Sequence, residues 1–273
     1  MLKILCPVDL GEASLNAINF AGNFTRKLGG SLTLFHAVPE ANLITREDFA
    51  SNELLEMQNK AMETLEKVCT ETSKEFAIDC DYIVELDTLN HGITKVAKSR
   101  EIDLILMGTK GVQNVAEYLG GSNTVHVMEH ADIPVLAIPA EHYKSEINNI
   151  VYATNYQVGD DESLTQLLHF ANSLDCRLTI IHVSHKGNPA KLEIFKSYRD
   201  YVFDEFYYDL DVKIEQVVYD DVEEGLREYM RVNNGDVLAM LTHHRNFFQE
   251  VFHTSMTRKM TLLAEYPVLV FHK

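Results

Sequence analysis

The sequence predicts an α/β protein made of two tandem, doubly wound domains of Rossmann-like type, each with a mostly parallel five-stranded sheet. Short runs rich in Val, Ile and Leu alternate with segments of helical periodicity, which is the pattern of parallel strands joined by right-handed crossovers. The order of these runs repeats at a spacing of about half the chain. The length of 273 residues is enough for two ordinary domains.

The first half of the chain carries this alternation in a regular order. Residues 3–9 form a β-type run, and the helical pattern that follows keeps one apolar face until Gly29 and Gly30 stop it. The last predicted strand of this half is led by Pro134. The elements predicted after Gly30 are strands at 31–37, 79–86, 103–107 and 133–138, and helices at 47–76, at 92–100 and from Ser122 onward.

The second half repeats the order of the first. Residues 177–183 match residues 31–37 almost position for position, and His182 stands where His36 stands. We expect a histidine at the end of such a strand to be structural. The repeat places the two domains at 1–143 and 147–273, with a polar, charged linker between them. The predicted elements are strands at 149–155, 177–183, 211–219, 236–240 and 266–271, and helices at 164–174, 189–208 and 222–232.

Composition and charge exclude several classes of function. Lys and Arg number 24, and Asp and Glu number 41, so the formal charge of −17 argues against binding to nucleic acid or to an anionic membrane. The sequence has no apolar run long enough for a membrane span, and its first residues read as a strand rather than as a secretory signal. The four cysteines lack a Cys-x-x-Cys spacing, so we expect reduced, mostly buried thiols in a cytoplasmic protein.

Two glycine-containing segments follow the predicted strand at 103–107. Gly108-Thr-Lys-Gly111 is separated by nine residues from Gly121-Ser122-Asn123. Glycine lets backbone N–H groups approach an anion, and a helix that starts at Ser122 adds unpaired N–H groups and the positive end of its dipole. The spacing is typical of a phosphate cradle, although two ordinary loops with one turn glycine each would contain the same residues.

The predicted topology brings these segments to one edge of the sheet. In open α/β sheets the ligand binds at the carboxyl ends of the strands, where the winding reverses. The loops after Asp9, His36 and Met107 all lie at that edge. Asp9 is there either a ligand-binding group or the cap of the following helix.

With these motifs and the internal repeat, the chain resembles a tandem universal stress protein over essentially its whole length. Nucleotide-binding members of that family carry Gly-2x-Gly-9x-Gly-Ser/Thr and an early Pro-x-Asp loop, and both patterns occur here. The resemblance implies ATP, with or without Mg²⁺, as the ligand. The glycine segments then hold its phosphates, Asp9 accepts hydrogen bonds from ribose or adenine, and Ala37 offers a backbone edge to adenine. The residues expected to contact the nucleotide are Pro7, Val8, Asp9, Ala37, Met107, Gly108, Gly111, Gly121, Ser122, Asn123 and Thr124.

The second half has lost this motif. Aligning Pro134 with Pro267 places Leu241 opposite Gly108, and Asn155 replaces Asp9. Likewise His244 falls opposite Gly111 and Thr254 opposite Gly121, while Ser255 alone matches. Side chains then occupy the space that a phosphate needs, so we expect that the second domain does not bind ATP in the manner of the family.

Histidines gather in the loops of the second half. Imidazole suits zinc and similar metals, but the spacing here is a weak signal, and polar loops around a closed pocket explain it as well. We therefore expect no metal site. The histidines that would supply one are His182, His185, His243 and His244.

The resemblance implies a nucleotide-dependent module in stress response or signalling, which is not primarily an enzyme and hydrolyses ATP slowly at most. The alternative is an interaction or regulatory protein with an incidental nucleotide site, whose second domain binds a metal or a small ligand. We expect the two domains to pair through their final strands, 135–138 and 268–271, as a pseudo-dimer within one chain. A homodimer and a protein partner of unknown identity are further candidates.

Overall fold

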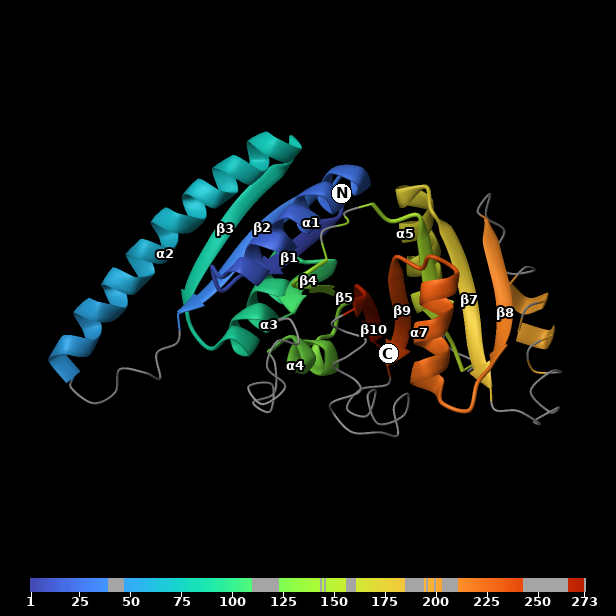
Figure 1. Cartoon of the computed structure of the whole chain (residues 1–273). Helices are drawn as coiled ribbons and strands as arrows, with labels where there is room; N and C mark the ends of the chain where they lie inside the picture. Colours follow the sequence, from blue (N-terminus) through green and yellow to red (C-terminus); the bar gives the residue numbers. More distant parts are fainter. Residues whose placement is uncertain are drawn as a thin grey trace. The chain divides into compact units, whose positions relative to one another are not determined.

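The computed structural model of the chain divides into two compact units, Met1–Ser145 and Glu146–Lys273 (Figure 1). They are called the first and the second unit. The structure describes residues 1–38, 47–109, 123–142, 144, 146–155, 161–184, 194, 196–198, 200–202, 211–242 and 265–272.

The first unit has a five-stranded sheet in the order β3-β2-β1-β4-β5, and every neighbouring pair in it is parallel. Helices α1 and α2 contact each other over the sheet, and so do α3 and α4. The strands are β1 (Lys3–Pro7), β2 (Ser31–Val38), β3 (Asp79–Leu86), β4 (Leu104–Thr109) and β5 (Val135–Pro139). The helices are α1 (Glu12–Leu28), α2 (Glu47–Phe76), α3 (Leu89–Arg100) and α4 (Asn123–His130).

The second unit repeats this sheet in the order β10-β9-β6-β7-β8, again with parallel neighbours. The predicted fold class, tandem doubly wound α/β with mostly parallel sheets, is thereby confirmed. The predicted helix at 189–208 falls largely outside the described residues, with 196–198 and 200–202 helical. The strands are β6 (Asn149–Ala153), β7 (Arg177–Ser184), β8 (Val212–Val218), β9 (Val237–Thr242) and β10 (Val268–His272), and the helices are α5 (Asp161–Leu174) and α7 (Val222–Val232).

Two glycines end α1 for different physical reasons. Gly29 adopts a left-handed conformation with φ of 65°, which an L side chain rarely adopts. Gly30 lies so close to the start of the sheet that a Cβ atom would be 2.4 Å from the carbonyl oxygen of Leu2. Since both positions exclude a side chain, the helix stops where the sequence predicted.

Polar caps set the starts of two other helices. The Thr88 hydroxyl accepts a hydrogen bond from the N–H of His91 at 3.4 Å, so α3 begins at Leu89 rather than at Gly92 as the sequence predicted. In α7 the Asp221 carboxylate accepts from the N–H of Glu224 at 2.9 Å. A threonine cap thus adds three residues to the predicted helix α3.

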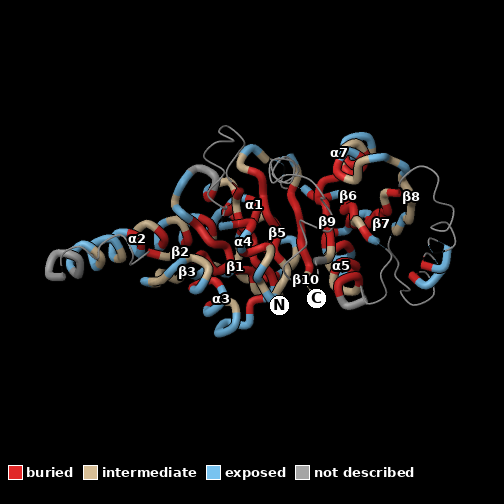
Figure 2. Tube along the Cα trace, turned by 90° about the horizontal axis from the view of Figure 1, so that it is seen from below, coloured by how far each residue is buried: buried red, intermediate tan, exposed pale blue. Residues whose placement is uncertain are grey.

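The central strands hold the core of each unit. In Figure 2 the buried colour follows these strands, and the side chains of Ile4, Leu104 and Val151 are at most 1% exposed. All four cysteines are free thiols, and all but Cys80 are buried. Burial raises the pKa of Cys6 to about 12, so its thiol stays neutral. Among the described helices, none combines the length and apolar character needed to cross a membrane.

Candidate functional site

The winding of the first unit reverses between β1 and β4. Strands β2 and β3 lie beyond β1 on one side, and β5 lies beyond β4 on the other. The carboxyl ends of β1 and β4 are therefore neighbours at the position where open α/β sheets bind ligands (Figure 1). Asp9 follows β1, and Gly108 is the second-last residue of β4.

Asp9 is exposed and shapes the start of α1. Its Oδ1 accepts hydrogen bonds from the N–H of Gly11 at 3.0 Å and from the Ser14 hydroxyl at 2.5 Å. The same hydroxyl oxygen accepts from the N–H of Asp9 at 2.9 Å. Asp9 thus has the turn-forming role that the sequence left open, and its exposed carboxylate stands at the carboxyl edge of the sheet.

His36 fixes the residue before Asp9. Its Nδ1 lies 2.8 Å from the carbonyl oxygen of Val8, and the N–H of Val8 donates to the carbonyl of Phe35 at 2.8 Å. A carbonyl oxygen only accepts, so the Nδ1 of His36 carries the proton. The side chain therefore has a structural role, because it ties β2 to the loop that bears Asp9.

The first turn of α4 is tied to the end of β4. The Thr124 hydroxyl donates to the carbonyl oxygen of Gly108 at 3.0 Å. Because Asn123 is the first residue of α4, this bond brings the N–H-bearing end of the helix to Gly108. Asn123 itself is exposed.

The described residues of the predicted set differ in what they can offer a ligand. Asp9 and Asn123 are exposed, and Ala37 and Gly108 are half-buried. The side chains of the remaining four belong to the core, so these residues can present only backbone atoms: Pro7, Val8, Met107 and Thr124. The predictions for Gly111, Gly121 and Ser122 lie outside the described residues.

The corresponding edge of the second unit keeps the same backbone arrangement. The N–H of Thr154 donates to Ile181 at 2.9 Å, and the Nδ1 of His182 lies 2.8 Å from the carbonyl oxygen of Thr154. However, Leu241 pairs with Phe271 in β10 as Gly108 pairs with Ile138 in β5. A leucine side chain thus stands at the register position of the glycine.

The histidines considered for a metal do not form a described cluster. His182 is buried and bonded to the backbone, while His185, His243 and His244 lie outside the described residues. Within the described ranges, no three or more His, Cys, Asp or Glu side chains are grouped so that they could hold a metal ion.

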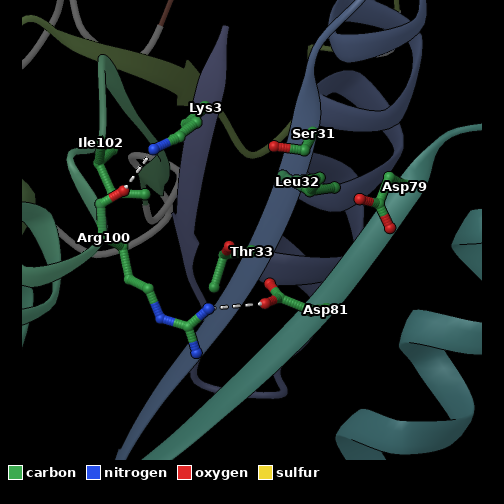
Figure 3. A pocket seen from close by; sticks show the side chains of 8 residues that line it. All are labelled: Lys3, Ser31, Leu32, Thr33, Asp79, Asp81, Arg100 and Ile102. Carbon is green, nitrogen blue, oxygen red and sulfur yellow. Dashed lines mark hydrogen bonds and ion pairs between the residues drawn. The ribbon is translucent and has the colours of Figure 1, made fainter. Parts of the chain in front are cut away.

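A polar cavity of about 330 Å³ lies at the opposite, amino edge of the first sheet (Figure 3). Its two cationic side chains already have partners: Lys3 contacts Glu101 at 3.1 Å, and Arg100 contacts Asp81 at 3.3 Å. The sequence alone does not predict this cavity, because its one signal is polar residues at the starts of neighbouring strands. It is lined by Lys3, Ser31, Leu32, Thr33, Asp79, Asp81, Arg100 and Ile102.

Comparison with known proteins agrees with the motif. The model of the universal stress protein family matches residues 1–139. A universal stress protein of Methanocaldococcus jannaschii is 24% identical over 155 residues, and one of Synechocystis is 23% identical over 149 residues. Each of these matches spans 50% of this chain, and they cover 93% and 96% of the two relatives.

Solved structures match over nearly the whole chain. A universal stress protein from Archaeoglobus fulgidus superposes with a TM-score of 0.75 at 18% identity, covering 99% of this chain and 98% of that chain. A protein described as a putative universal stress protein from Pseudomonas aeruginosa gives a TM-score of 0.60 at 16% identity, covering 99% and 92%. At these identities the likeness concerns the fold.

Proposed function

Because the chain belongs to the universal stress protein family, we propose that its first unit binds ATP at the carboxyl edge of the sheet and that nucleotide occupancy controls its action in stress response or signalling. The observation that carries the proposal is the position of Asp9 and Gly108. Asp9 follows β1 and Gly108 lies in β4, the two neighbouring strands between which the winding reverses.

The phosphate end of the nucleotide lies at α4. The described part of α4 starts at Asn123, and the Thr124–Gly108 hydrogen bond at 3.0 Å keeps this turn at the end of β4. Unpaired N–H groups and the helix dipole favour an anion there. Gly108 lacks a side chain, so the backbone of β4 is open to the phosphates.

The nucleoside end lies over β1 and β2. Asp9 is exposed at the end of β1, where its carboxylate accepts hydrogen bonds from ribose or adenine. Ala37 is half-buried in β2, and its backbone borders the adenine. Val8 and Met107, whose side chains are 3% exposed, form the floor beneath.

The second unit does not take part in this binding. Leu241 replaces Gly108 at the same register position, and Asn155 replaces the carboxylate of Asp9. The second unit instead presents its surface to a partner, and nucleotide binding alters the chain's affinity for that partner through two conformations of unequal nucleotide affinity. A cytoplasmic location and association of two chains are part of the proposal.

Adding a negative charge where we place the phosphates tests the proposal. Asn123→Asp adds a carboxylate to the first turn of α4, which favours the helix through its dipole but repels phosphate. We expect ATP affinity, measured by calorimetry with and without Mg²⁺, to fall roughly tenfold, which is about 1.4 kcal/mol. Helix stability should not fall, so loss of folding does not account for loss of binding.

The matched control is Asn19→Asp, which adds the same charge to an exposed position within α1. It should bind ATP as the unchanged chain does. Equal affinities for all three proteins would contradict a phosphate site at α4. An absence of ATP binding in the unchanged chain would favour the interaction protein with an incidental site.

A further inference from the structure

Two histidines form a pair on the surface of α4. His126 and His130 are one helical turn apart, and both are exposed. Their rings stack with centroids 4.2 Å apart and planes inclined by 19°. Since helical side chains lean toward the preceding turn, the His130 ring lies over the turn that carries His126.

A backbone contact fixes the ring of His130. Its Nδ1 lies 2.9 Å from the carbonyl oxygen of His126. The carbonyl only accepts, so Nδ1 carries a proton, and in the neutral ring Nε2 keeps its lone pair. Histidines that bind metals usually donate their other N–H in this way, to a backbone carbonyl or a carboxylate.

We propose that His126 and His130 form a two-histidine site for a divalent ion of the copper, nickel and zinc group. Two nitrogens that share one ion at about 2.0–2.1 Å lie about 3 Å from each other. The ring centroids are 4.2 Å apart and both side chains are exposed, so rotation about their side-chain bonds can turn one nitrogen of each ring toward a shared ion. Imidazole nitrogen suits all three metals, with copper bound most tightly.

Water completes the coordination of the ion. The described residues offer no group of three or more metal-binding side chains, so within the described part of the chain the site has two protein ligands and is open. An open site leaves positions for an exogenous ligand. It also differs from the site considered in the second unit, because it involves none of the histidines discussed there.

The ion links two turns of α4 and thereby stabilises the helix. Residues 126 and 130 span one turn, and the N-terminal turn of the same helix bonds to Gly108 through Thr124. A ligand that binds only the folded helix shifts its opening equilibrium toward the closed form. Hydrogen exchange in α4 should therefore slow when metal is added.

The test uses the full chain without a histidine affinity tag. Cu²⁺, Ni²⁺ and Zn²⁺ are titrated separately by calorimetry into the unchanged chain, His126→Gln, His130→Gln and the double variant. We expect one site with the order of affinity copper above nickel and zinc, weakened roughly tenfold or more in each single variant. Metal should slow exchange in α4 of the unchanged chain and leave it unaltered in the double variant.

The matched control is His91→Gln. His91 is also exposed on a helix, but its Nδ1 contacts Asp87 at 2.6 Å and not a second histidine. This variant should bind metal as the unchanged chain does. The proposal is overturned if no saturable binding occurs, which leaves the pair as a stacked surface contact. It is equally overturned if the double variant binds like the unchanged chain, which places the metal on other histidines.

Discussion

The two units hold the carboxyl edge of their sheets in the same way but present different side chains there. In each, a histidine Nδ1 lies 2.8 Å from the carbonyl of the residue that follows the first strand: His36 on Val8, and His182 on Thr154. At the neighbouring strand the first unit has Gly108, and the second has Leu241. The backbone framework is thus repeated, while the groups that we propose to contact the nucleotide are not.

At the amino edge of the sheets, the two units share a hydrogen bond between an aspartate and the backbone of the first strand. The Asp103 carboxylate accepts from the N–H of Lys3 at 2.8 Å, and the Asp236 carboxylate accepts from the N–H of Asn149 at 3.0 Å. Each aspartate precedes the strand next to the first one of its unit. The units thus share this contact at the amino edge, although they differ at Gly108 and Leu241 near the carboxyl edge.

Exchanging the glycine and the leucine should have the largest effect on the difference in ATP binding between the two units. We predict that Gly108→Leu weakens ATP binding roughly hundredfold, or about 2.8 kcal/mol, because the side chain fills the space of a phosphate. The fold should persist, since Leu241 occupies the same register position in a parallel sheet. Calorimetry measures the affinity, and circular dichroism checks folding.

The reciprocal variant Leu241→Gly is the control for this exchange. It alters the second unit alone and should leave ATP affinity unchanged. If Gly108→Leu binds ATP normally, or if Leu241→Gly is the variant that loses binding, the assignment of the nucleotide to the first unit is wrong.

Replacing the equivalent histidines His36 and His182 tests how much each contributes to the stability of its unit. His182 is 3% exposed and His36 is half-buried, so His182→Ala also loses packing around its ring. We predict that the free energy of unfolding falls by about 2–3 kcal/mol in His182→Ala and by about 1 kcal/mol in His36→Ala. In the full chain, hydrogen exchange of β1 and β2 measures the stability of the first unit, and exchange of β6 and β7 measures that of the second. A larger loss of protection from His36→Ala would show that burial does not govern the difference.

Alkaline pH should affect the second unit through Tyr229. Its hydroxyl donates a hydrogen bond to Glu215 in β8, whereas the edge strand of the first unit is held by the exposed Arg100–Asp81 ion pair. Burial, and then the contact with Glu215, raises the pKa of Tyr229 above its ordinary value of 10.0. Above that pH the unfolded chain loses the proton and the folded chain keeps it, so stability declines as pH rises.

Tyr229→Phe tests this smaller effect. We expect it to cost about 1 kcal/mol at neutral pH through the lost hydrogen bond, and to reduce the decline of the melting temperature between about pH 9 and pH 11.5. Thermal unfolding followed by circular dichroism across that range measures both. An unchanged decline in the variant would mean that other groups cause it.

The fold was largely predictable because its signals are local. The apolar runs predicted all ten strands of the described residues to within a few positions, and Gly29 and Gly30 predicted the end of α1. The predicted start of α3 is three residues late. The helix is extended by the Thr88 cap, which depends on the hydrogen bond from the N–H of His91 to the Thr88 hydroxyl.

The site was less predictable because it depends on contacts between distant segments. The order of elements was enough to bring Asp9 and Gly108 to one edge. It did not show that Met107 and Thr124 have buried side chains, or that Asp9 is bonded to Ser14. The spacing of four between His126 and His130 is present in the sequence, but the stacking of their rings requires the structure.

The number of ATP molecules bound per chain tests the central claim most directly. Native mass spectrometry of the stripped protein, titrated with ATP and Mg²⁺, resolves that number for each chain. We predict one ATP per chain, lost in Gly108→Leu and retained in Leu241→Gly. Two per chain would contradict the loss of the site in the second unit, and none would contradict a nucleotide site in the first.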